Sequence, residues 1–161
     1  METKLIAFLL VGIVVGAGVG IGVGYFVFNE DVQEDPTYWF YIDFEGGVTD
    51  FESGWVSAKA TNTTDAFFKA LGNERIPYEY STAWGIFVSS IGGLSSVNVP
   101  PYSPSWMMWD WSGSEWVESM GIADSTAKIM FIGYTELDAE FSPMLDLDKV
   151  SGWKNTGPFK K

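Results

Sequence analysis

Residues 5–28 read LIAFLLVGIVVGAGVGIGVGYFVF, twenty-four residues without a charge, a proline or a strongly polar side chain. An α-helix rises about 1.5 Å per residue, so this stretch is long enough to cross a hydrocarbon core about 30 Å thick. We therefore predict an N-terminal transmembrane anchor over residues 1–28. A cleaved signal peptide is the alternative, because Lys4 precedes the apolar run and residues 16–18 are small enough for a cleavage site. The unbroken apolar continuation to Phe28 favours the anchor.

Glycine recurs at every fourth position of this stretch, at Gly12, Gly16, Gly20 and Gly24. Such spacing puts the glycines near one helix face, where another helix backbone can approach closely within a membrane. The pattern predicts helix association, either with a partner protein or with a second copy of the chain. The alternative is that glycine is simply frequent in transmembrane helices.

The charges around the apolar stretch predict its orientation. Lys4 precedes it, whereas four acidic residues follow it within a linker at 29–37, namely Glu30, Asp31, Glu34 and Asp35. Basic residues stay on the cytoplasmic side of a membrane. We therefore predict a single-pass cell-membrane protein with a cytoplasmic N-terminus and an extracytoplasmic C-terminal domain.

Composition restricts the function of that domain. The chain has 21 acidic and 9 basic residues, a formal net charge of −12, and no cluster of bases of the kind that nucleic-acid binding requires. It has no cysteine and no histidine, so disulfides, thiol nucleophiles, zinc ligands and the commonest general base are all missing. These absences predict a non-enzyme without a cofactor, whose stability comes from packing of its many aromatic residues.

Carboxylates are the remaining candidates for chemistry. Asp110 beside Glu115 or Glu118 is the pair that could cleave a glycosidic bond, but solvated hairpin charges are the favoured interpretation. Asp146 and Asp148 lack the glycine and the distal glutamate of a calcium loop. We predict no metal site.

Alternating and periodic apolar residues predict the secondary structure. Residues 38–44, YWFYIDF, alternate as a strand with Tyr38, Phe40, Ile42 and Phe44 on one face. Further strands are expected at 85–91, 106–111 and 128–135, with weaker ones near residues 55–56, 78–80 and 115–117. A helix is expected to begin at Thr63 or Thr64 and to end at Gly72. The prediction is an α+β domain at 38–136, a mixed sheet packed on one short helix.

Residues 137–161 contain several helix and strand breakers, and we predict a C-terminal tail. Its apolar residues could cover one edge of the sheet, and the alternative is a loose tail. The residues expected to make that cover are Phe141, Met144, Leu145 and Leu147.

Several segments together resemble a known family. The helix opening TTDAFFKA, the strands GIFVSSIGG and KIMFIGYTE, and the segment WMMWDWSG are similar to the transcobalamin C-terminal-like domain, also called DUF4430. The resemblance covers Tyr38–Glu136 and implies a β-grasp-like fold on a surface protein. The family's turn residues carry over only at Gly113 and Asp124. Cobalamin binding is not implied, because the large helical partner domain is absent from this chain.

The aromatic hairpin near residues 106–116 predicts a function. If exposed, Trp106, Trp109, Trp111 and Trp116, with Tyr102 in the adjoining loop, could stack on a glycan, another small ring ligand or a partner protein's aromatic residues. The alternative is that these tryptophans belong to the core. We therefore predict a membrane-anchored, non-catalytic binding module. A structural component of a cell-envelope complex, assembled through the glycine-rich helix, is the second hypothesis.

Asn62-Thr63-Thr64 forms an N-glycosylation sequon on the predicted outer side. Modification of Asn62 is one interpretation of this triplet, and helix capping by its threonines is the other.

Overall fold

A five-stranded mixed sheet forms the centre of the C-terminal unit in the computed structural model, which describes residues 34–83, 85–97 and 104–161. The strand order is β2-β1-β8-β6-β7, and only the β1–β8 pair is parallel. The strands are β1 (Thr37–Asp43), β2 (Gly54–Lys59), β6 (Ser105–Trp111), β7 (Trp116–Ser119) and β8 (Ile129–Thr135).

The parallel strands β1 and β8 are apolar on both faces. On β1, Phe40 and Ile42 belong to one core cluster, whereas the intervening Tyr41 belongs to a second cluster. On β8, Met130 and Phe131 divide between the two clusters in the same way. Because successive side chains of a strand point to opposite faces, each face of this sheet needs its own cover.

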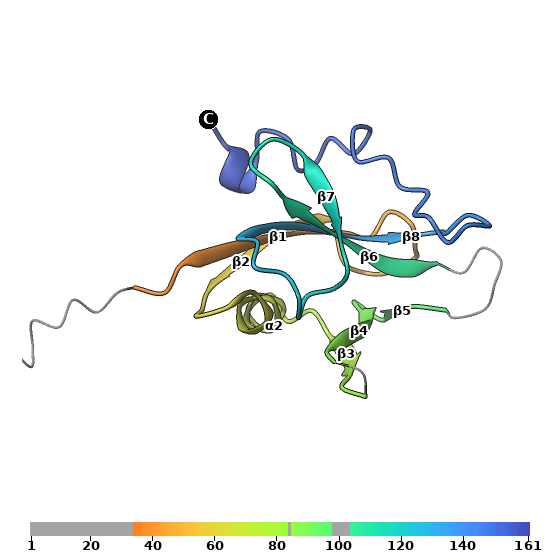
Figure 1. Ribbon diagram of the computed structural model, residues 1–161, viewed down its shortest axis with the longest axis horizontal. Helices are drawn as coiled ribbons and strands as arrows, with labels where there is room; N and C mark the ends of the chain where they lie inside the picture. The colour runs from red at the N-terminus through yellow and green to blue at the C-terminus, as the bar shows by residue number, and fades with distance from the viewer. Residues whose placement is uncertain (1–33, 84, 98–103) are drawn as a thin grey trace, which may run out of the picture. The chain divides into compact units, whose positions relative to one another are not determined.

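One face is covered by helix α2 (Thr63–Asn73) and a second, three-stranded sheet (Figure 1). The second sheet consists of β3 (Tyr78–Ser81), β4 (Phe87–Ile91) and β5 (Leu94–Ser95). Phe67 and Leu71 of α2 are fully buried, and Phe67 meets Phe40 edge to face with ring centroids 5.3 Å apart. The predicted strand at 38–44 and the helix near 63–71 are therefore confirmed.

The other face is covered by the C-terminal segment, residues 137–161, which ends in the short 3-10 helix η1 (Gly157–Phe159) (Figure 1). Leu145, Leu147, Val150 and Trp153 of this segment pack against the second core cluster. The predicted tail thus covers a sheet face and not a sheet edge. Phe141 and Met144, which were expected to take part in the cover, are 63% and 59% exposed.

The predicted fold class is wrong. An N-terminal transmembrane helix followed by a small α+β, β-grasp-like domain was expected, with a single mixed sheet on one short helix. The described chain is instead mostly sheet, with two sheets and one helix of 11 residues. The β4 segment cannot join the main sheet beside β6, because β8 and β7 already occupy both sides of β6.

No helix within residues 34–83, 85–97 and 104–161 is both long and apolar enough to span a membrane. The predicted anchor at 5–28, with Gly12, Gly16, Gly20 and Gly24, lies outside the described residues.

Both ends of α2 differ from the prediction. Asn62 is the N-cap, and its side-chain oxygen accepts a hydrogen bond of 2.8 Å from the Asp65 amide. Thr63 and Thr64, expected as caps, donate instead to main-chain oxygens of residues 127 and 122. At the other end, the helix continues through Gly72.

The chain leaves α2 through Arg75, whose φ of 56° lies in the left-handed region. The amides of Arg75 and Ile76 bond back to the carbonyls of Gly72 and Leu71 at 3.1 and 2.9 Å. This pair of bonds is the Schellman arrangement, in which glycine is the usual left-handed residue. Arginine there costs about 1 kcal/mol or more in backbone strain.

We predict that Arg75→Gly raises the free energy of unfolding by about 1 kcal/mol, because glycine adopts positive φ without a steric penalty. Urea denaturation of the full chain measures the change. Arg75→Ala is the matched control, since it removes the same side chain but keeps the strained Cβ. Equal stabilities of the glycine and alanine variants would contradict the prediction.

Candidate functional site

The β6–β7 hairpin and the C-terminal segment together place an aromatic cluster over one face of the main sheet. Successive side chains of β6 point to opposite faces of the main sheet. Trp109 and Trp111 therefore face the C-terminal segment, whereas Trp106 faces α2 and the small sheet. Trp116 is the register partner of Trp111, and the two rings meet at 5.0 Å and 65°. The hairpin therefore adds a third indole to the same face.

Trp153 completes this cluster from the C-terminal segment. Its ring lies 5.4 Å from that of Trp116 at 88°, and 6.2 Å from that of Trp111. Its indole N–H donates to the main-chain oxygen of Leu147 at 3.1 Å, which fixes the ring against its own segment. Edge-to-face contacts of this kind add stability beyond the buried area.

Phe159 of η1 lies among four tryptophan rings. Its centroid is 5.0 Å from that of Trp111, 5.5 Å from Trp153, 5.8 Å from Trp55 and 6.2 Å from Trp116. Trp55 also donates its indole N–H to Thr156 at 3.0 Å. The end of the chain is thus fixed to the sheet by both ring contacts and a hydrogen bond.

A cavity of about 640 Å³ opens between the hairpin and the C-terminal segment. We call it the tryptophan groove. Its aromatic lining is Trp109, Trp111, Trp116 and Trp153, and its remaining walls are the hairpin tip at 114–115 and residues 143–148. This volume falls within the range of small-molecule sites, and the mixture of aromatic and polar groups is typical of them.

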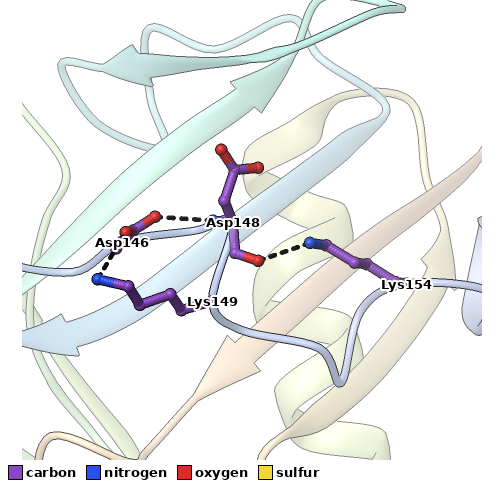
Figure 2. A network of polar contacts seen from close by, with 4 residues as sticks. All are labelled: Asp146, Asp148, Lys149 and Lys154. Atoms are coloured by element: carbon purple, nitrogen blue, oxygen red, sulfur yellow. Dashed lines mark hydrogen bonds and ion pairs between the residues drawn. The ribbon is translucent and has the colours of Figure 1, made fainter.

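The polar wall of the groove is held by a short network (Figure 2). Asp146 accepts a hydrogen bond of 3.1 Å from the Asp148 amide and forms an ion pair of 3.0 Å with Lys149. Lys154 donates to the main-chain oxygen of Asp148 at 2.6 Å. The hydrogen bonds from Lys149 and the Asp148 amide lower the pKa of Asp146, so that carboxylate stays ionised well into the acidic range.

Trp116 differs from three other indoles of the domain in the bonding of its polar atom. Its Nε1 atom is buried and has no hydrogen-bond partner, the single such side-chain atom within the described part of the chain. The indoles of Trp55, Trp106 and Trp153, in contrast, each donate to a protein oxygen. An unsatisfied buried donor costs about 1–3 kcal/mol, and this atom has almost no accessible surface through which a ligand in the groove could reach it.

Below the C-terminal segment, the sheet face is closed by close contacts at two glycines. A Cβ at Gly152 would overlap the Tyr41 hydroxyl, and a Cβ at Gly133 of β8 would lie 2.6 Å from a methyl of Leu145. The segment approaches the sheet closely because neither position carries a side chain. Tyr41 stacks on Phe131 at 5.2 Å beneath it.

The predicted ligand-binding residues are thus only partly brought together. Trp109, Trp111 and Trp116 line the groove, although Trp109 is only 6% exposed. Trp106 is buried on the opposite face, where its indole donates to the Leu94 oxygen at 2.8 Å. An open surface formed by all four hairpin tryptophans is therefore excluded. Tyr102 lies outside the described residues.

The acidic pair considered for glycoside cleavage is divided between the faces of the sheet. Asp110 pairs in register with Val117 and accepts a hydrogen bond of 2.9 Å from Ser125. Glu118 is the register partner of Trp109, so it lies on the groove face, and Glu115 lines the groove. Asp110 cannot act on the same bond as either glutamate.

Two other positions considered from the sequence, a possible metal site and the glycosylation sequon, can be compared with the structure. Across residues 34–83, 85–97 and 104–161, no group of three or more His, Cys, Asp or Glu side chains could hold a metal ion. Asn62 of the sequon is exposed, and its side-chain nitrogen donates to the Asp65 carboxylate at 2.8 Å.

Trp153 and Asp148 were missed as site residues. They lie in a segment without apolar periodicity, whose sequence indicated Leu145 and Leu147 as covering residues but neither Trp153 nor Asp148 as part of a site.

Neither the comparison with models of known protein families nor that with curated proteins finds a match to this chain. The resemblance to the transcobalamin C-terminal-like domain therefore stays a prediction.

We predict that Gly152→Ala loosens the C-terminal segment and lowers the free energy of unfolding by about 1–3 kcal/mol, because the added methyl overlaps the Tyr41 hydroxyl. Urea denaturation followed by tryptophan emission measures the change. Gly54→Ala is the control, since a Cβ there has no atom within 4 Å. Equal effects of the two substitutions would show that the segment does not lie against Tyr41.

Tyr41 also gives a pH prediction. Burial, with smaller contributions from the charges of Asp43 and Glu45, raises the pKa of Tyr41 from 10.0 to about 12. The unfolded chain therefore loses this proton first, so the stabilisation is full below pH 10 and is lost as the pH rises from 10 to 12. Between pH 10 and 12, the free energy of unfolding should fall by about 2 kcal/mol less in Tyr41→Phe than in the parent protein. Parallel stability curves for variant and parent would contradict the assignment.

Proposed function

We propose that the described domain is a non-catalytic binding module, and that the tryptophan groove is its binding site for a small ring-shaped ligand. The observation that carries the proposal is a cavity of about 640 Å³ that four tryptophan side chains line together, namely Trp109, Trp111, Trp116 and Trp153. Flat indole faces bind the apolar face of a ring, and the polar groove residues Glu115, Asp146 and Asp148 can orient it.

The rigidity of the walls supports this proposal. Trp111 and Trp116 belong to one hairpin, and Trp153 is fixed by its hydrogen bond to Leu147. Side chains that are already fixed lose little conformational entropy when a ligand binds. The non-catalytic part of the proposal rests on the residues: the chain lacks histidine and cysteine, and Asp110 lies across the sheet from Glu118.

The location outside the membrane and the assembly through residues 12–24 stay predictions from the sequence, because those residues lie outside the described ranges. No observation in the domain favours the structural-component hypothesis over the binding module.

Indole ¹H–¹⁵N spectra of the full chain test the proposed site. Four probes are added in turn: cellohexaose, chitohexaose, hexagalacturonate and nicotinamide. We expect at least one probe to shift the indole signals of Trp111, Trp116 and Trp153 and to leave that of Trp106 unchanged, since Trp106 lies on the opposite face with its N–H already bonded.

Single Trp→Phe substitutions assign the signals. Equal shifts at Trp106 and at the groove tryptophans would mean a general change in the protein, and would contradict the proposal. Spectra unchanged by every probe would also contradict it.

A further inference from the structure

The charged lining of the tryptophan groove is acidic. Glu115, Asp146 and Asp148 line it, and none of its described lining residues is a lysine or an arginine. Asp146 forms an ion pair of 3.0 Å with Lys149. The side chains of Glu115 and Asp148 are exposed and form no hydrogen bond or ion pair with any described residue. The Asp148 carboxylate points away from Asp146 and Lys154 (Figure 2). The groove therefore offers two carboxylates beside its tryptophan rings.

A positively charged group of the chain already lies against one wall of the groove. The Lys154 Nζ atom is 5.3 Å from the centroid of the Trp153 ring, and it donates to the main-chain oxygen of Asp148 at 2.6 Å. Trp153 and Asp148 both line the groove. An ammonium group over an indole face makes a cation–π contact, and tryptophan is the best aromatic partner for it. This wall thus holds a cation within the protein itself.

Charge distinguishes the ring-shaped ligands that such a groove could take. An anionic ring would be repelled by Glu115 and Asp148, in a chain of net charge −12. A neutral ring can stack on the indoles but gains no attraction between charges. A cationic ring stacks in the same way and is also attracted by the indole faces and by both carboxylates. A single exposed ion pair raises affinity by up to about fivefold.

We infer that the ligand of the tryptophan groove is a positively charged ring, such as a pyridinium or a cycloalkylammonium ion. This inference rests on the proposed function and names the charge class of the ligand at the same site.

Two series of probes that differ mainly in charge test the inference by indole spectra of the full chain at neutral pH. The first series is nicotinamide methylated at its ring nitrogen, which is a cation, then neutral nicotinamide and anionic nicotinate. The second is cyclohexylammonium, cyclohexanol and cyclohexanecarboxylate. Each cation should shift the Trp111, Trp116 and Trp153 signals with about tenfold higher affinity than its neutral counterpart. The anions should bind most weakly. High salt should reduce the advantage of the cations, because it screens exposed charges.

The decisive variants are Glu115→Gln and Asp148→Asn, which nearly keep the side-chain shape and remove one charge. Each should lower the affinity for the methylated cation about threefold and so reduce its advantage over nicotinamide. Glu79→Gln is the matched control, because Glu79 is exposed on β3 outside the groove lining and its loss changes the net charge equally. It should leave the affinity for the cation nearly unchanged. Thermal unfolding of the three variants establishes that they are folded.

The outcomes separate this inference from the proposed function. If a neutral or anionic probe shifts the groove signals and binds at least as tightly as its cationic counterpart, the charge inference is overturned and the binding module stands. If Glu79→Gln weakens cation binding as much as the two groove variants do, the overall charge causes the preference and the inference is also overturned. If no probe of either series shifts the groove signals, both the inference and the proposed function fail.

Discussion

The structure depends on a sheet in which the parallel strands β1 and β8 are apolar on both faces. Phe40, Ile42 and Met130 point one way, and Tyr41 and Phe131 point the other way. Burial of an aromatic or aliphatic side chain contributes about 1.5–3 kcal/mol, so neither face could be left to water without a large loss of stability. The chain therefore supplies two covers. Helix α2 and the small sheet form one, and the C-terminal segment forms the other (Figure 1).

The two covers differ in kind, and that difference creates the groove. A helix presents a continuous apolar stripe, and Phe67 and Leu71 of α2 are fully buried against the sheet. The C-terminal segment has little regular structure and contacts the sheet through separate side chains such as Leu145, Val150 and Trp153. Space is left beside the hairpin, and the indoles of Trp109, Trp111, Trp116 and Trp153 line it.

Regular elements could be predicted from the sequence because their apolar residues are periodic. The strand at 38–44 and the helix near 63–71 follow from spacing alone. Successive side chains of a strand point to opposite faces, so the separation of Trp106 from Trp109 and Trp111 also follows from the sequence. The prediction that all the hairpin tryptophans form one surface disregarded this alternation and was wrong. The left-handed conformation of Arg75, just after the end of α2, could not be predicted, since that position normally belongs to glycine. The places of Trp153 and Asp148 in the groove could not be predicted either. Their segment has no apolar periodicity, so only its tertiary packing determines which of its residues line the groove.

The central claim is that the C-terminal segment lies on the aromatic sheet face and forms one wall of the groove. Nuclear Overhauser effects from the methyl groups of Leu145 in the full chain test it most directly. We expect contacts from these methyls to Gly133 and to the rings of Phe131 and Trp109, with methyl signals shifted upfield by the rings. Leu145 methyls at the shifts of an unfolded chain, without contacts to β8, would contradict the account.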